Sequence, residues 1–368
     1  MESFDVAVRG AGIVGRSLAL ALGGQGLRVA VVGEPSGARG PDVRAYALNA
    51  ASVALLRRLK VWDTLPQHAA TPVYEMSVHG DANDAHLEFS AWQQRTSELA
   101  WIVDAALLER ELDTAIRFAP HVKLCDAAPP ATLTAVCEGR SSAMRASLGI
   151  EFDRHDYGQR AVAARLVASR PHQGVAWQWF RAPDVLALLP FDAPQPASSY
   201  ALVWSVPAER ADELLGMDHE AFDAALNEAT GGAAGTLKLA SDRAAWPLAL
   251  ATASRWAGPG WVLLGDAAHL VHPLAGQGLN LGLGDVAALA GVIAKREPWR
   301  RLDDPRLLRR YVRERAAPTW AMGRTTDALW RLFAHPAAPA RELRNRGLTL
   351  VDRLPPLKRW LTGRALGS

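Results

Sequence analysis

The sequence predicts an α/β protein built from two domains. At the amino end a strand, a glycine-rich turn, a helix and a second strand follow one another within residues 4–32. Residues 151–250 instead hold strand-like segments rich in aromatic side chains. The chain has 368 residues, more than one compact core usually holds. We therefore expect a Rossmann-like domain that binds a nucleotide, joined to a second domain made mainly of β-sheet.

The glycine-rich turn carries the pattern GxGxxG. It follows FDVAV at 4–8 and precedes the helical segment RSLALALGGQG and the strand LRVAVV at 27–32. The first glycine permits a tight turn, the second lets backbone approach a pyrophosphate, and the third lets helix and strand pack closely. The free N–H groups at the helix start favour an anion. The residues predicted to hold the pyrophosphate are Gly10, Gly12, Ile13, Val14 and Gly15.

Two positions depart from the usual dinucleotide pattern. An acid commonly ends the second strand and binds the ribose, but Gly33 stands there and Glu34 follows it. Glu34 is therefore the candidate ribose ligand. Arg9, directly before the first glycine, is expected to pair either with phosphate or with an acidic side chain.

A second glycine-rich stretch, GDAAHLVHPLAGQGLNLGLGD, begins at residue 265. His269 and His272 are spaced for one helical face, but Pro273 follows and no third metal ligand is evident, so we predict no metal. A Walker phosphate loop and a GxSxG nucleophile elbow are both absent. The apolar strand WVLLGD at 261–266 ends in an acid suited to sugar-like hydroxyls. We expect this stretch to meet residues 10–15 over one ligand.

Composition and charge narrow the classes of protein. Apolar residues make up 49% and charged residues 21%, as in soluble globular proteins. No apolar run is long enough for a spanning helix, and the acidic start is the wrong order for a secretory signal. Only Cys125 and Cys137 are present, which favours a reducing compartment, so we expect a cytoplasmic protein. No nucleic-acid-reading module is visible.

The carboxyl end is strongly basic. Residues 301–368 hold 15 Arg and Lys against 6 Asp and Glu, a balance of +9, whereas the rest of the chain carries −6. The segment is predicted to be helical, with apolar positions alternating with basic ones. Two interpretations stay open: a solvated face packed against the first domain, or an interfacial segment that draws the protein to anionic lipid.

Several stretches together resemble one family. The paired motifs GxGxxG and GDAAHxxxPxxGQGxNxGxxD are similar to the FAD motifs of flavoprotein aromatic hydroxylases. More narrowly, the chain resembles the ubiquinone-biosynthesis hydroxylases, through DVRAYALNAAS, HDYGQRAV, RPHQGVAWQWF, LALLP and the carboxyl-terminal block RNRGLTLVDRLPPLKRWLTGRALG. The resemblance implies a p-hydroxybenzoate hydroxylase-like fold, in which a β-sheet substrate domain is inserted into the FAD-binding domain and helices follow.

The domain boundaries that we expect are discontinuous. The FAD-binding domain is assigned to residues 1–70, 100–150 and 255–330, and the substrate domain to 71–99 and 151–254. The basic helical segment is assigned to 331–368.

The resemblance also implies roles for particular residues around FAD. Arg44 would approach the cofactor, Asp266 would bind the ribityl chain, and Gly265 would allow that approach. The ring would be bordered by the side chain or backbone of Pro273, Gly276, Gln277, Gly278, Leu279 and Asn280. Asp285 is instead expected to be a surface or capping acid.

Nicotinamide and substrate contacts are predicted at other positions. Glu138 and Gly139 stand where the family has an Asp-Gly motif linked to FAD and NAD(P)H. The polar or aromatic candidates for the substrate pocket are Tyr157, Gln173, Trp177 and His272. Trp177 and Trp179 alternate, so we expect one to face the pocket and the other to pack elsewhere. No catalytic acid or base is assigned.

The activity that the resemblance implies is hydroxylation of a polyprenylated phenol. NAD(P)H reduces FAD, the reduced flavin and O2 give a flavin hydroperoxide, and its distal oxygen is transferred to the ring. Two alternatives stay open: an FAD dehydrogenase of the same fold acting on another apolar substrate, and a flavin-binding accessory subunit of a quinone-synthesis complex. The basic helices suggest a location peripheral to the inner membrane, in contact with such a complex.

Overall fold

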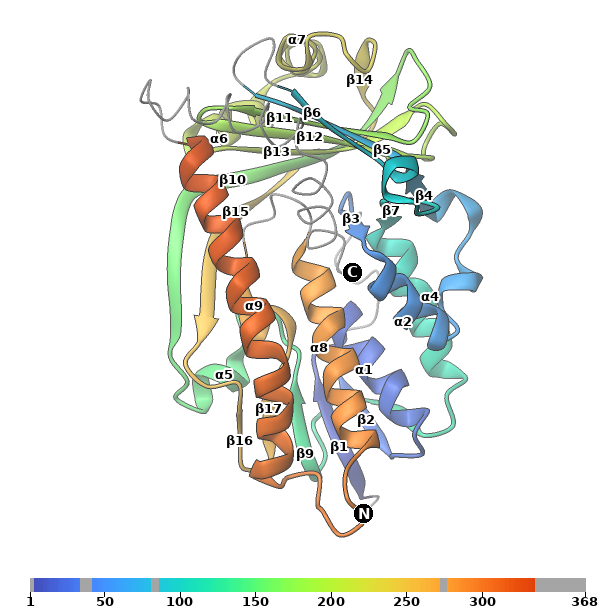
Figure 1. Ribbon diagram of the computed structural model, residues 1–368, viewed down its shortest axis with the longest axis vertical. Coiled ribbons are helices and arrows are strands. Elements are labelled where there is room, and N and C mark those ends of the chain that lie inside the picture. The colour runs from blue at the N-terminus through green and yellow to red at the C-terminus, as the bar shows by residue number, and fades with distance from the viewer. Residues whose placement is uncertain (1–2, 34–41, 81–85, 272–276, 335–368) are drawn as a thin grey trace.

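The computed structural model describes residues 3–33, 42–80, 86–271 and 277–334 (Figure 1). Four of the predicted site residues, Glu34, His272, Pro273 and Gly276, lie outside the described residues. So does most of the basic segment, from residue 335 to the carboxyl end.

The first sheet is mainly parallel and contains the amino-terminal strand at its centre. Its order is β16-β17-β9-β1-β2-β8, and only the β16–β17 pair is antiparallel. The strands are β16 (Ala257–Gly258), β17 (Trp261–Leu263), β9 (Ala131–Val136), β1 (Phe4–Arg9), β2 (Val29–Val32) and β8 (Val122–Cys125). The carboxyl ends of β1, β9 and β17 therefore lie side by side at one edge of the sheet. The starts of both glycine-rich motifs meet at this edge.

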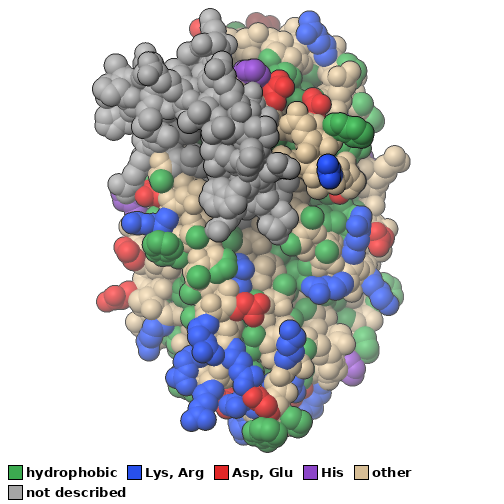
Figure 2. All heavy atoms as spheres, viewed as in Figure 1, with side chains coloured by type: hydrophobic (Ala, Val, Ile, Leu, Met, Phe, Trp, Pro, Cys, Tyr) green, Lys and Arg blue, Asp and Glu red, His purple; other side chains and the backbone are tan. Residues whose placement is uncertain are grey.

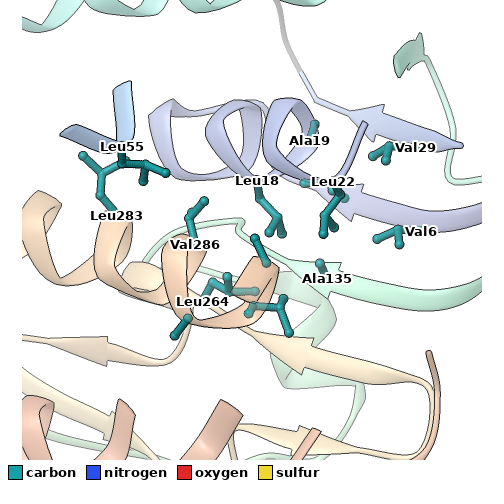
Figure 3. Close-up of a cluster of buried hydrophobic side chains, with 14 of the residues drawn as sticks. Val6, Leu18, Ala19, Leu22, Val29, Leu55, Ala135, Leu264, Leu283 and Val286 are labelled. Atoms are coloured by element: carbon teal, nitrogen blue, oxygen red, sulfur yellow. The ribbon is translucent and has the colours of Figure 1, made fainter. Parts of the chain in front are cut away.

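Helices α1 (Ile13–Gly23) and α8 (Gln277–Ala294) pack against each other on this sheet. Figure 3 shows Leu18 and Leu22 of α1 pointing toward α8, Val286 of α8 pointing toward α1, and Leu283 lying beside Leu55. Leu18, Leu22 and Val286 are fully buried, which stabilises the arrangement by the transfer of apolar surface from water.

A larger sheet forms the other end of the molecule. Its order is β18-β15-β10-β13-β12-β11-β5-β6, and β14 also pairs with β10. The strands are β5 (Glu75–His79), β6 (His86–Ser90), β10 (Phe152–Ala168), β11 (Val175–Arg181), β12 (Asp184–Phe191), β13 (Ser199–Pro207), β14 (Leu237–Leu239), β15 (Ala244–Ala253) and β18 (His269–Leu270). Figure 1 shows β10 and β15 running the length of one side, so they connect the two ends of the molecule.

The two faces of the large sheet are covered differently. Helices α6 (Ala208–Gly216) and α7 (His219–Thr230) pack on an outer face rich in large side chains, among them Leu202, Trp204 and Leu188. The opposite, inner face is turned toward the first domain, because Arg165 on it donates to the carbonyl of Arg44 at 2.9 Å.

The remaining elements join these two bodies. A small sheet of order β3-β7-β4 lies beneath the large one (Figure 1). The bounds are β3 (Ala45–Leu48), β4 (Ala70–Val73), β7 (Ala100–Asp104), α2 (Ala50–Arg58), α3 (Ala91–Gln94), α4 (Ala105–Arg117), α5 (Ala143–Ser147), α9 (Pro305–Ala334), and the short 3-10 turns η1 (Trp62–Thr64), η2 (Gln67–Ala69) and η3 (Gly265–Ala267).

The predicted α/β class with an added β-sheet domain is confirmed. The domain boundaries stay a prediction, and one strand crosses them: β18, within 255–330, pairs with β15 of the large sheet. Among the described helices, none combines the length and apolar character needed to cross a membrane.

Candidate functional site

The first glycine turn allows two very close backbone approaches. A Cβ on Gly10, whose φ is +107°, would lie 2.3 Å from the Cys137 carbonyl oxygen. A Cβ on Gly15 would lie 1.9 Å from the carbonyl oxygen of Gly10. Gly12, the N-cap of α1, has no atom within 4 Å of its ideal Cβ. Two glycines thus shape the turn, while the third leaves open space at the helix start where a phosphate can approach N–H groups.

Gly33 explains why no acid ends the second strand. Its φ is +152°, and a Cβ there would lie 2.7 Å from the backbone nitrogen of Ala11. The chain leaving β2 crosses the glycine turn so closely that no side chain fits at this position.

The second glycine-rich turn lies against the first. A Cβ on Gly265 would lie 3.3 Å from Cγ2 of Val14, and one on Gly282 would lie 2.7 Å from the same methyl. Val14 belongs to α1, Gly282 to α8 and Gly265 to η3. The structure therefore brings the two motifs, about 250 residues apart in the sequence, to one place.

Asp266 presents a carboxylate that no residue in the described part of the chain binds. It has neither a hydrogen-bond nor an ion-pair partner among the described residues, and its side chain reaches solvent although protein surrounds it on most sides. Burial raises the pKa of this carboxyl, although His269, Arg140 and Arg44 lie near enough to oppose the rise. A carboxylate that is surrounded by protein on most sides, reaches solvent and has no described partner fits a ligand that donates hydrogen bonds, such as a polyol chain.

Asp285 holds this turn from beneath, so the expectation of a surface or capping acid is wrong. It is fully buried and accepts hydrogen bonds from the Gly265 N–H at 2.9 Å, His269 Nε2 at 2.7 Å and Arg315 Nε at 2.7 Å. Burial opposes its ionisation, but His269 and Arg315 outweigh that effect and keep its pKa below the ordinary value. The carboxylate links η3, β18 and α9 to helix α8.

Arg44 stands at the start of β3, close to the amino end of α1. It forms a two-pronged ion pair with Asp42 and donates to the Tyr46 hydroxyl at 3.1 Å. Glu109 lies 3.6 Å from Arg44 and 3.9 Å from Arg16 of α1. The guanidinium is thus fixed beside the dinucleotide turn, and its electrostatic influence reaches Asp266.

The start of α8 is tied to the β3–α2 junction by Asn280. Its side-chain oxygen accepts from the Asn49 N–H at 3.0 Å and from Ser52 Oγ at 2.7 Å, and its nitrogen donates to the Ala47 carbonyl at 2.8 Å. The amide therefore fixes the backbone of Gly278 and Leu279, the residues directly before it. The Asn280 side chain is thus engaged within the protein, and the ligand role predicted for the Gly278 and Leu279 backbone stays a prediction.

Comparison with known proteins identifies the family. The model of the FAD binding domain family matches residues 3–121 and 130–326. The ubiquinone hydroxylase UbiL of Rhodospirillum rubrum is 31% identical over 99% of this chain and 90% of its own length. The 3-demethoxyubiquinol 3-hydroxylase of Escherichia coli is 30% identical over 99% of this chain and 98% of its own. The chain belongs to the FAD-dependent ubiquinone hydroxylase family.

Solved structures confirm the predicted fold of this family member. The p-nitrophenol 4-monooxygenase PnpA of Pseudomonas putida superposes with a TM-score of 0.79 at 19% identity, covering 100% of this chain and 99% of that one. HpxO of Klebsiella pneumoniae, solved with FAD, superposes with a TM-score of 0.74 at 19% identity, covering 98% and 99% of the two chains. The residues present also fit FAD, because the open space at Gly12 and the free Asp266 carboxylate suit its diphosphate and its polyol.

Arg9 and Glu138, two of the residues that depart from the usual patterns, pair with each other. Arg9 Nε donates to Glu138 at 2.8 Å, which settles the choice between phosphate and acid. The same carboxylate accepts from Ser142 Oγ at 2.7 Å and from the Met144 N–H at 2.9 Å. Burial opposes ionisation of Glu138, but these three partners outweigh it and lower its pKa. Glu138 therefore holds the start of α5, beside Gly139.

The prediction for Trp177 and Trp179 is wrong. Residues i and i+2 of a strand share one face, and these rings lie 6.0 Å apart and nearly parallel, both stacked with His79. They pack with the outer-face cluster beneath α6 and α7. Trp177 thus lies on the side of the sheet away from the FAD-binding domain and is no pocket residue.

Gln173 and Tyr157 lie in different surroundings. Gln173 is exposed in the turn before β11, with φ at +51°, and the pocket role predicted for it stays a prediction. Tyr157 is buried at the side of the inner face with Val203, and its hydroxyl donates to Asp327 of α9 at 3.2 Å. The pocket role predicted for Tyr157 stays a prediction.

A row of residues across the inner face was missed by sequence reasoning. Gln178, Ala187 and Val203 are in register on β11, β12 and β13, and each is half-buried. The residues beside them, such as Leu188 and Trp204, face outward and are buried. The signal was present as an alternation of small and large side chains in SYALVWSV and VLALLP, but the choice of face depends on the pairing of the strands.

Proposed function

We propose that this protein is an FAD-dependent monooxygenase that hydroxylates the aromatic ring of a polyprenylated phenol in ubiquinone biosynthesis. The observation that carries the proposal is the free carboxylate of Asp266 beside the open turn at Gly12, in a chain whose relatives are ubiquinone hydroxylases. NAD(P)H is the proposed electron donor and O2 the second substrate. Bound FAD supplies the redox chemistry that activates O2 for insertion into the ring.

The chain's own residues bind and orient the cofactor. In this proposal the backbone of Gly10–Gly15 binds the diphosphate, helped by the partial positive charge at the start of α1. Asp266 accepts hydrogen bonds from the ribityl hydroxyls, and Arg44 supplies a positive charge at the same edge. Asp285 keeps Gly265 at its φ of +58°, so that Asp266 faces the ligand.

The inner face of the large sheet is the proposed wall for the substrate ring. Ala187 and Val203 provide small apolar contacts, and Gln178 brings an amide to the same row. Such a wall excludes water, which protects the activated oxygen from loss as hydrogen peroxide. Tyr157 borders this wall and positions it against α9 through Asp327.

Contact with a lipid surface belongs to the same proposal. Arg306, Arg309 and Arg313 of α9 are exposed and have no ion-pair partner among the described residues. Figure 2 shows Lys and Arg side chains gathered over the lower part of α9. A cationic face of this kind is attracted to anionic headgroups, which would bring the enzyme to a membrane-dissolved substrate and to other ubiquinone-synthesis proteins.

Profiling quinone precursors in a strain that lacks the gene tests this function. We expect a prenylated phenol lacking one hydroxyl to accumulate, and the wild-type gene to restore the downstream quinone. The Asp266→Asn variant should restore it poorly. Unchanged quinone levels in the deletion strain would contradict the proposed function, and the accumulated compound would identify the ring carbon.

A further inference from the structure

A groove of about 840 Å³ lies outside the cofactor site, between α9 and the strands β15, β16 and β18. Its apolar residues, such as Leu250, Trp256 and Leu270, are partly buried. Its charged residues, Asp153, Arg255, Arg309 and Arg324, are exposed. The groove therefore has an apolar floor and a mainly cationic edge.

Helix α9 forms one wall of the groove, and contacts on either side of the groove fix its position. Near its start the Tyr311 hydroxyl donates to the Leu263 carbonyl at 2.9 Å. Farther along, Gly323 packs against Leu250, where a Cβ would lie 3.5 Å from Leu250 Cδ1. Residues recurring every four positions along this side of α9 line the groove: Leu308, Val312, Ala316 and Trp320.

This apolar stripe is unusual for a surface helix. Trp320 is 67% exposed and Ala316 is exposed as well, although both belong to the side of α9 that faces the strands. Contiguous exposed apolar surface with a polar edge marks binding sites more often than plain surface. The volume is near the upper part of the range of roughly 300–1,000 Å³ found for sites that take one small molecule.

The groove is continuous with the second glycine-rich turn. His269 and Val271 line it, and His269 bonds to Asp285, which in turn holds the Gly265 N–H. Val271 directly precedes the segment that leads to Gln277, the first residue of α8. A molecule bound in the groove would therefore contact residues that lie close in sequence to the cofactor-binding turn.

We propose that this groove binds the isoprenoid tail of the substrate. The inference rests on the proposed function, because only a prenylated ring carries such a tail. A linear hydrocarbon matches the shape: the wall from Pro305 to Arg324 is roughly 30 Å long at 1.5 Å per helical residue. The cationic edge with Trp320 suits a lipid surface, so the tail can pass from the bilayer into the groove.

Binding of an isoprenoid without a ring tests the groove directly. The probe is geranylgeraniol, titrated by calorimetry into the purified FAD-loaded protein. Ala316→Trp fills the groove, whereas Ala317→Trp adds the same side chain to the next residue of the same helix, which is exposed but does not line the groove. We expect Ala316→Trp to weaken binding by about tenfold or more and Ala317→Trp by less than about twofold, because only the first displaces buried hydrocarbon.

Steady-state kinetics separate this inference from the proposed function. Ala316→Trp should raise the KM of a long-tailed phenol about tenfold, with kcat and the KM of the same phenol without a tail within about twofold. Two results would contradict binding of the tail in the groove without contradicting the proposed hydroxylation. One is an equal effect of the two tryptophan variants, and the other is an Ala316→Trp enzyme that prefers the long-tailed phenol as strongly as wild type does. Selective loss of geranylgeraniol binding in a protein that hydroxylates no prenylated phenol would instead overturn the proposed function alone.

Discussion

The carboxylate of Asp285 accepts the backbone N–H of Gly265 at 2.9 Å, and this contact joins helix α8 to the turn that presents Asp266. The same carboxylate binds Arg315 and His269. One buried charge therefore connects the cofactor turn, the wall of the apolar groove and the helix that packs on α1.

Removing one partner of this cluster should lower the stability of the folded protein. We expect Asp285→Leu to lower the free energy of unfolding by about 3–5 kcal/mol, because it leaves the Arg315 guanidinium buried without its counter-charge. The double variant Asp285→Leu with Arg315→Met should recover part of that loss. Urea unfolding of both single variants and the double variant measures the coupling, and strictly additive effects would contradict the buried pair.

The glycine turn offers a variant that removes cofactor binding without unfolding the protein. Gly12→Ala adds a methyl in open space at a φ of −79°, so the apoprotein should keep its Tm within about 2 °C. The methyl occupies the space predicted for the diphosphate, so the Kd for FAD should rise by about tenfold or more. Gly216→Ala, also in open space, serves as the control and should change neither quantity.

Gly15→Ala should behave in the opposite way. Its Cβ would lie 1.9 Å from the Gly10 carbonyl oxygen, so helix and turn must move apart. We expect a loss of about 2–3 kcal/mol in the stability of the apoprotein. A Gly15→Ala protein as stable as wild type would show that the turn does not have the described geometry.

Asp266 should make the stability of the apoprotein depend on pH. Burial raises its pKa in the folded state above the model value of 3.8, so the folded state binds more protons than the unfolded state between the two pKa values. The wild-type apoprotein should therefore lose stability relative to Asp266→Asn as the pH rises from that value through the raised pKa. Thermal unfolding of both apoproteins from pH 4 to pH 8 measures the difference in Tm. If the Tm of the wild type rose relative to that of Asp266→Asn with increasing pH, the raised pKa of Asp266 would be contradicted.

Glu138 should affect stability rather than the use of nicotinamide. Its carboxylate is engaged by Arg9, Ser142 and Met144, so Glu138→Gln should cost about 1–2 kcal/mol after allowance for partial exposure. The KM for NAD(P)H should stay within about twofold. A large rise in that KM without a fall in Tm would assign Glu138 a direct contact with the donor.

Sequence reasoning succeeded where the physical cause is local. The roles of Gly10 and Gly15 follow from backbone sterics within a few residues, which the GxGxxG pattern records. It failed for Asp285, whose partner Arg315 is thirty residues away and whose burial depends on the packing of α8 against α9.

The residues of the large sheet show a second limit of prediction from the sequence. Trp177 and Trp179 share a face by the period of the strand alone, but only the pairing with β5 and the packing of α6 and α7 decide which face is outward. The row of Gln178, Ala187 and Val203 likewise requires the register of neighbouring strands.

The most direct test of the central claim follows the oxygen atom. The purified protein is loaded with FAD and supplied with NAD(P)H, a prenylated phenol and isotopically labelled O2, and the product is examined by mass spectrometry. We predict one labelled hydroxyl per NAD(P)H consumed, and its loss in Gly12→Ala. A product whose added oxygen comes from water, or NAD(P)H oxidation that the phenol does not stimulate, would contradict the account.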